Sequence, residues 1–113
     1  MLKKTVLRKN KDFDALYRKG KSAADRYVVV FIAKNRLSYP RTAFLASKKV
    51  GNSVSRNRAR RLMKEAIRLS EVKVPAGYDC IFIARNSILD AKCRDVQRSI
   101  ESALKRTGVL KTK

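Results

Sequence analysis

The sequence predicts an α+β fold, a two-layer α/β sandwich in which about three helices pack on a small central sheet. Three segments rich in β-branched and aromatic residues indicate strands, and three others carry apolar residues at helical spacing. A length of 113 residues is enough for one modest core and too short for two. We therefore expect one domain over residues 1–113, in the order helix, strand, strand, an optional further strand, helix, strand and helix.

The first helix is expected near the N-terminus. Asn10 is a suitable N-cap residue, because its side chain can accept a hydrogen bond from a free backbone N–H of the first turn. Phe13, Leu16 and Tyr17 then recur at helical spacing, and Gly20 is expected to end the helix.

Three strands are expected from composition and from turn residues. Segment 27–33 (YVVVFIA) is the first, and a turn over 37–41 leads to the second, over 42–47 (TAFLAS). Pro and Gly in segment 75–77 break the chain before the third strand, over 79–84 (DCIFIA). The last helix is expected to be capped by Asp90 and ended by Gly108. Its apolar residues are Val96, Ile100, Ala103 and Leu104.

The charge of the chain limits its partners. Its 29 Lys and Arg residues against nine Asp and Glu give a formal charge of +20, which attracts polyanions, above all nucleic acid. A membrane surface is the second possibility, but it would favour bulky aromatic residues opposite a basic helix face. No apolar run approaches the roughly 18 to 20 residues that span a bilayer, and the first ten residues do not resemble a secretory signal. We therefore expect a cytoplasmic protein with no membrane partner and no small-molecule substrate.

The cysteines do not indicate a metal site. Cys80 and Cys93 stand alone, and the chain contains no histidine, so the ligands of a zinc site are missing. Two buried thiols in a reducing cytosol are the expected state.

Residues 48–68 (KKVGNSVSRNRARRLMKEAIR) form the most unusual segment. A helix is expected over about 54–70, with its core-facing arc formed by Ala59, Leu62, Met63, Ala66 and Ile67. A basic ridge steps along another side at four-residue spacing, formed by Arg56, Arg60, Lys64 and Arg68. Asn57 and Arg61 lie beside this ridge, and Arg58 lies nearer the opposite margin of the apolar arc. An ordinary solvated helix face would mix Glu with Lys, whereas this segment has one acid, so it indicates a phosphate backbone as partner.

The start of this helix adds a second anion-binding feature. Gly51, Asn52 and Ser53 precede the helix, where free N–H groups and the positive end of the dipole favour a phosphate. Lys48 and Lys49 arrive there from the preceding strand.

The aromatic residues indicate a separate surface. Phe13 and Tyr17 are one turn apart on the first helix, and Tyr27, Val29 and Phe31 alternate along one face of the first strand. Aromatic rings on a sheet close to Lys and Arg form a stacking platform for single-stranded bases. The alternative, in which Phe13 and Phe31 are ordinary core residues, is open at this stage.

The motif SKKVGNSVSRNRARRLMKEAIR, with NKDFDALYRKG before it and DCIFIAR after it, resembles the protein subunit of bacterial ribonuclease P from about residue 7 to residue 84. The resemblance implies an α/β sandwich with a left-handed β-α-β crossover through the helix that carries the RNR sequence. It also implies binding to a catalytic RNA and to precursor tRNA, whose 5′ leader the assembly removes.

The resemblance implies a role for each matching residue. Arg56, Asn57 and Arg58 match the motif, and Lys48, Lys49, Asn52, Arg60, Arg61, Lys64 and Arg68 surround it on the expected RNA-binding surface. Phe13, Tyr17 and Phe31 match the aromatic positions of the cleft that takes the single-stranded leader.

The chain lacks the residues of a self-sufficient nuclease. It has no histidine, and its only close pair of acids, Asp12 and Asp14, projects to different sides of a helix. We therefore expect no catalytic or metal-binding residue in the protein, and magnesium bound mainly by the RNA subunit. A structural RNA binder such as a ribosomal protein, and a nonspecific nucleic-acid chaperone, are the alternatives.

Overall fold

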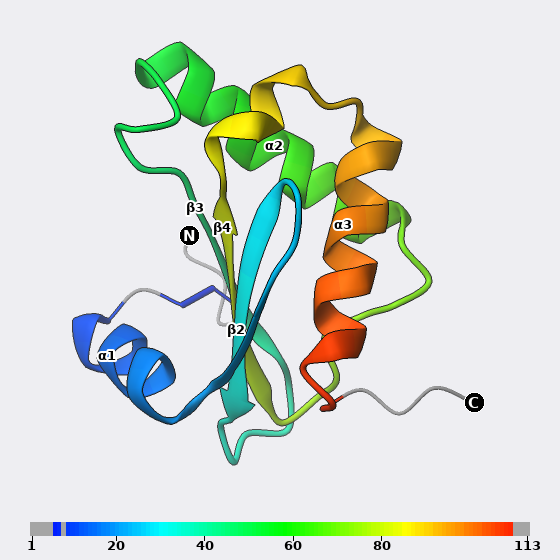
Figure 1. The fold of residues 1–113 in the computed structure, drawn as a ribbon. Coiled ribbons are helices and arrows are strands. Elements are labelled where there is room, and N and C mark those ends of the chain that lie inside the picture. Colours follow the sequence, from blue (N-terminus) through cyan, green and yellow to red (C-terminus); the bar gives the residue numbers. More distant parts are fainter. Residues whose placement is uncertain (1–5, 8, 110–113) are drawn as a thin grey trace.

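A computed structural model describes residues 6, 7 and 9–109, which form three α-helices, one short 3-10 helix and a four-stranded sheet (Figure 1). The predicted α+β class is confirmed. No described helix is long and apolar enough to cross a membrane. In chain order the elements are α1 (Asn10–Lys19), β1 (Lys21–Ala24), β2 (Val28–Lys34), β3 (Arg41–Leu45), α2 (Ser53–Leu69), β4 (Tyr78–Ala84), the 3-10 helix η1 (Asn86–Asp90) and α3 (Cys93–Arg106).

The strands lie in the order β1-β2-β4-β3. β2 pairs with β1 and β4 in antiparallel register, whereas β3 pairs with β4 in parallel. Two parallel neighbours cannot be joined by a tight turn, so the chain crosses over through α2 between β3 and β4. The left-handed sense of this crossover stays an expectation of the resemblance.

Both faces of the sheet are apolar, because side chains alternate along each strand. On one face Val30 and Phe82 belong to the main core with α2 and α3, to which α2 contributes the fully buried Ala59, Met63 and Ala66. On the other face Phe31 and Ile81 pack near Leu16 of α1. α1 therefore lies on the opposite side of the sheet from α2 and α3, as a partial third layer beside the expected two (Figure 1).

Two predicted helix caps are wrong. Asn10 is already the first helical residue, and Lys9 occupies the N-cap position without a side-chain hydrogen bond. Asp90 ends η1 and does not cap α3, which begins at Cys93. Ala91 and Lys92 separate η1 from α3, and the Asp95 carboxylate accepts a hydrogen bond from the Lys92 backbone N–H at 3.0 Å.

The edge of the sheet also differs from the prediction. No strand was predicted at β1, because KSAA is short and has no apolar alternation. In the structure the segment is mostly exposed, and its pairing with β2 makes it a strand. Tyr27 precedes β2 and packs against the main core, so it does not share a face with Phe31. Arg41, assigned to a turn, is the first residue of β3, which ends at Leu45.

A polar cluster around Asp25 fastens the β1–β2 hairpin to α3. The Asp25 carboxylate accepts hydrogen bonds from Ser99 Oγ at 2.9 Å and from Arg106 at 2.7 Å, and Ser99 Oγ also accepts one from the Tyr27 backbone N–H. Burial by itself would raise the pKa of Asp25, but the bonds donated to its charged form outweigh burial and lower that pKa.

We predict that Asp25→Asn lowers the free energy of unfolding at pH 7 by about 1 to 3 kcal/mol. The pKa of Asp25 is lower in the folded chain, so its contribution is present above the unfolded-state pKa of about 3.9 and is lost as pH falls through the folded pKa. Denaturant titrations from pH 7 to pH 2 should show the two proteins converging below about pH 4. Asp90→Asn, at an exposed site, is the charge-matched control. A difference that stays constant over this pH range would contradict the assignment.

Candidate nucleic-acid interface

The first turn of α2 packs closely against the residues that precede the helix. Asn52 is the N-cap, and its side chain accepts a 2.9 Å hydrogen bond from the Ser55 backbone N–H. Gly51 has a φ of 148°, and a Cβ there would lie 2.9 Å from the Cβ of Ser55, so a glycine is needed. Ser53 and Val54 are exposed, which leaves the positive end of the helix dipole open to an anion.

The RNR sequence occupies the first two turns of α2. Arg56 is half-buried and donates to Ser53 Oγ at 3.3 Å; its Nε is buried without a hydrogen-bond partner among the described residues. Arg60 donates to the Asn57 side-chain oxygen at 2.7 Å, which orients the guanidinium and the amide as one unit. Asn57 therefore keeps its side-chain NH₂ group for a phosphate or a ribose hydroxyl.

The far half of the basic ridge has a different environment. The Lys64 ammonium lies 6.0 Å from the centroid of the Phe44 ring on β3, the strand at the edge of the sheet. Arg68 forms an exposed ion pair with Glu65, and its Nε donates to that carboxylate at 3.0 Å. Glu65 lowers the net charge at this end of the ridge, so the N-terminal half of α2 is the more strongly positive part.

The other margin of α2 carries Arg58 and Arg61, both exposed, beside a shallow hollow of about 390 Å³ that Leu62 and Cys93 also line. Neither arginine has an ion pair within the described chain. Cys93 is only half-buried, so the expectation of two buried thiols holds for Cys80 alone, whose pKa is raised by burial.

A second basic hollow, of about 530 Å³, lies where β3 and β4 end. Lys49 lines it from the turn after β3, and Arg85 lines it from the residue after β4; Lys48 is exposed beside them. Sequence analysis missed Arg85. Its position directly after a strand could have predicted that it lies near Lys49, because the carboxyl ends of two parallel strands meet at one edge of a sheet.

The aromatic surface lies on the face of the sheet that α1 partly covers. Tyr17 is 42 % exposed, and its ring meets Phe31 edge-on, with centroids 5.0 Å apart. Burial and the neighbouring Asp14 raise the pKa of Tyr17, so its hydroxyl stays protonated at neutral pH. Phe13 is half-buried and packs against the same cluster as Phe31. Phe13 and Phe31 therefore belong both to the aromatic surface and to the core. Tyr27 does not belong to the aromatic surface.

The described acids form no metal site. No group of three or more His, Cys, Asp or Glu side chains comes together within residues 6, 7 and 9–109. Asp12 and Asp79 are both paired with Arg41, whereas the exposed Asp14 lies near Tyr17.

Comparison with known proteins gives a consistent result. The family model described as ribonuclease P matches residues 1–108. The ribonuclease P protein component of Pelotomaculum thermopropionicum is 47% identical over 104 residues, covering 92% of this chain and 93% of that protein. The corresponding component of Clostridioides difficile is also 47% identical over 104 residues, with 91% of each chain covered.

Solved structures agree with this result. The RNase P protein of Staphylococcus aureus superposes with a TM-score of 0.82 at 34% identity, covering 96% of this chain and all of that one. The RNase P protein of Thermotoga maritima superposes with a TM-score of 0.75 at 25% identity, covering 94% of this chain and 97% of that one. The ribosomal-protein alternative finds no support in these relatives.

We predict that Arg60 and Arg68, both on the basic ridge, differ in their contribution to RNA binding. If Arg60 contacts a phosphate, Arg60→Ala should flatten the log–log salt dependence of RNA affinity by about 0.7 to 0.9. Arg68→Ala should flatten it by less than half as much, because Glu65 already compensates that charge. Binding titrations of the catalytic RNA from 50 to 400 mM salt measure both slopes, and Glu65→Gln is the control that should increase the contribution of Arg68. Equal slopes for the two alanine variants would show that the pairing does not matter.

Proposed function

The chain belongs to the ribonuclease P protein family, and from that membership we propose how its two surfaces divide the work of the holoenzyme. Ribonuclease P is an endoribonuclease in tRNA processing, and the protein is one subunit of it, with the ribonuclease P RNA as partner. Our proposal is that α2 binds this RNA while the aromatic surface takes the 5′ leader of precursor tRNA. The free thiols of Cys80 and Cys93 support a cytoplasmic location.

The proposed contact between α2 and the RNA rests on charge and geometry. The N-terminal half of the helix carries Arg58, Arg60 and Arg61. An arginine side chain can donate two N–H hydrogen bonds to the oxygens of one phosphate. The Asn52 cap leaves first-turn N–H groups for a further phosphate. Lys48 and Lys49 extend the same positive surface toward the ends of β3 and β4.

The proposed leader site rests on a single observation, the contact between the exposed Tyr17 ring and the half-buried Phe31 ring on the sheet face away from α2 and α3. The face of each ring is a sequence-tolerant partner for an unstacked base. Half-buried Val29, Leu45 and Ile83 continue this face, which suits a single strand with its bases turned inward.

The chemistry of cleavage is proposed to belong to the RNA subunit. Magnesium would supply the activated water and stabilise the leaving oxygen. The donor set of the protein fits this assignment, because the described acids mostly serve internal ion pairs and caps. What the protein contributes is orientation of the leader and screening of phosphate repulsion, which lowers the magnesium concentration that the RNA needs.

We predict that the purified protein alone does not cleave precursor tRNA at any magnesium concentration. The catalytic RNA should cleave slowly at low magnesium, and adding the protein should raise that rate. Single-turnover cleavage of a 5′-labelled precursor measures both. Cleavage that persists after all RNA has been removed from the protein preparation would contradict the assignment.

We predict that Tyr17→Ala weakens holoenzyme affinity for precursor tRNA by about 5- to 150-fold, because stacking is worth roughly 1 to 3 kcal/mol per base. Affinity for mature tRNA should change little, since it carries no leader. Phe31→Ala and Phe13→Ala should differ from Tyr17→Ala in lowering the melting temperature, because both phenylalanine rings pack against the buried cluster. A well-folded Tyr17→Ala protein with unchanged precursor affinity would remove Tyr17 from the site.

A further inference from the structure

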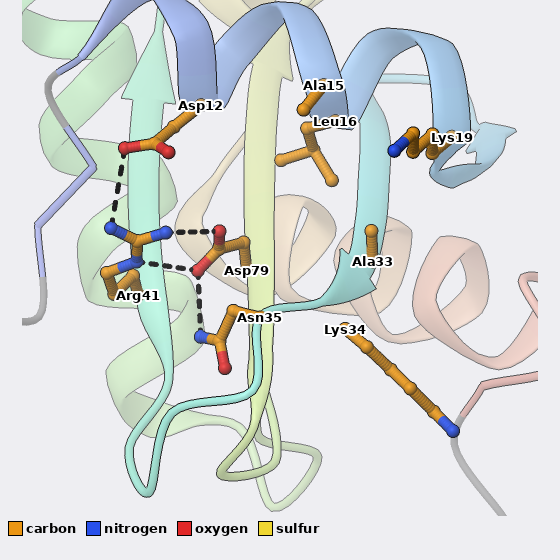
Figure 2. A pocket seen from close by; sticks show the side chains of 9 residues that line it. All are labelled: Asp12, Ala15, Leu16, Lys19, Ala33, Lys34, Asn35, Arg41 and Asp79. Atoms are coloured by element: carbon orange, nitrogen blue, oxygen red, sulfur yellow. Dashed lines mark hydrogen bonds and ion pairs between the residues drawn. The ribbon is translucent and has the colours of Figure 1, made fainter.

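A partly buried polar cluster lies beneath α1 (Figure 2). Asp79 of β4 is only 7 % exposed, and its carboxylate accepts two hydrogen bonds from Arg41, from Nε at 2.8 Å and from Nη2 at 2.7 Å. The Asn35 side chain donates a third, at 2.8 Å. These contacts hold the Arg41 guanidinium in one orientation on the sheet.

The remaining guanidinium nitrogen of Arg41 points to α1. Nη1 lies 3.4 Å from the Asp12 carboxylate, in the first turn of the helix. Lys9 at the N-cap position makes no side-chain cap at this end of the helix. A cavity of about 210 Å³ lies between this side of α1 and the sheet, so close packing does not fix the helix there.

The two flanks of α1 carry different groups. Asp12, Ala15 and Lys19 line the polar cavity, whereas Phe13 and Tyr17 lie on the other flank, toward Phe31. Asp12 and Phe13 are consecutive residues on a rigid helix. A change in the distance between Asp12 and Arg41 would therefore be expected to rotate the helix and to move the Tyr17 ring relative to Phe31.

We infer that Asp12 is a positioning residue for the leader, acting through Arg41 and Asp79 to set the position of Tyr17 over the sheet. A direct contact of Asp12 with RNA phosphate would be unfavourable, because both carry negative charge. The inference rests on the proposed leader site, and it assigns a function to an ion pair that would otherwise count only toward stability.

The test compares two acids on the same helix. Asp12→Asn and Asp14→Asn each remove one negative charge from α1, but only Asp12 contacts Arg41. Asp14 lies near Tyr17 and raises its pKa, so Asp14→Asn measures the effect of removing a charge beside the ring, and the wild-type chain is the second reference. In reconstituted holoenzyme, Asp12→Asn should bind leader-carrying precursor about 3-fold or more weakly than the wild-type chain, and more weakly than Asp14→Asn. Affinity for the RNA subunit and for mature tRNA should be equal in the two variants.

Two further variants separate positioning from a general loss of structure. Asp12→Glu keeps the carboxylate and the favourable charge at the helix N-terminus, so it should restore most of the precursor affinity. In a Tyr17→Ala background, Asp12→Asn should have no further effect on precursor affinity, because the ring that it positions is gone.

Each outcome bears on the inference. Equal precursor affinity for Asp12→Asn and Asp14→Asn would overturn it, as would a full effect of Asp12→Asn in the Tyr17→Ala background. A parallel loss of RNA-subunit and precursor affinity would also overturn it, since that result indicates misfolding. If Tyr17→Ala itself leaves precursor affinity unchanged, the proposed leader site fails; if Tyr17→Ala acts and the two asparagine variants do not differ, only the positioning role fails.

Discussion

Strand β4 is the constraint on which the rest of the molecule depends. It is paired on both edges, with β2 and with β3, and it is buried on both faces. Phe82 belongs to the core beneath α2 and α3, whereas Ile81 belongs to the cluster beneath α1. The basic helix and the aromatic surface are thus placed on opposite sides of one strand, and a change in its register would displace both.

The few acids of this chain serve mainly to fold it. Six of the nine have partners in the described structure: Asp12, Asp25, Glu65, Asp79, Asp95 and Glu101. Asp25 and Asp79 each join elements distant in the sequence and accept several hydrogen bonds. Within residues 6, 7 and 9–109, ion pairs to acids are formed by Arg41, Arg68 and Arg106, and the formal charge of +20 leaves a surplus of cations for a polyanion.

The two surfaces differ in the physics that they use. α2 presents several cations, whose attraction to phosphate acts at long range but falls steeply with salt. In the proposed leader site, Tyr17 and Phe31 would act at contact distance, so their effect would depend on where α1 holds the Tyr17 ring. An assembly that combines them can gather RNA by charge and then select a single-stranded segment by shape.

The sequence by itself determined the sign of the charge, the extent of α2 to within a residue at each end and the residues that it buries, because a helical period is a local property. It also indicated β2, β3 and β4 from their composition. Only the tertiary structure decided that KSAA becomes an edge strand, that Tyr27 turns to the main core and that Arg85 joins Lys49. Arg41 joins Asp12 and Asp79 across 29 and 38 residues of chain. No periodicity reports a contact over such a separation, because it exists only once the strands are paired and the helix is packed on them.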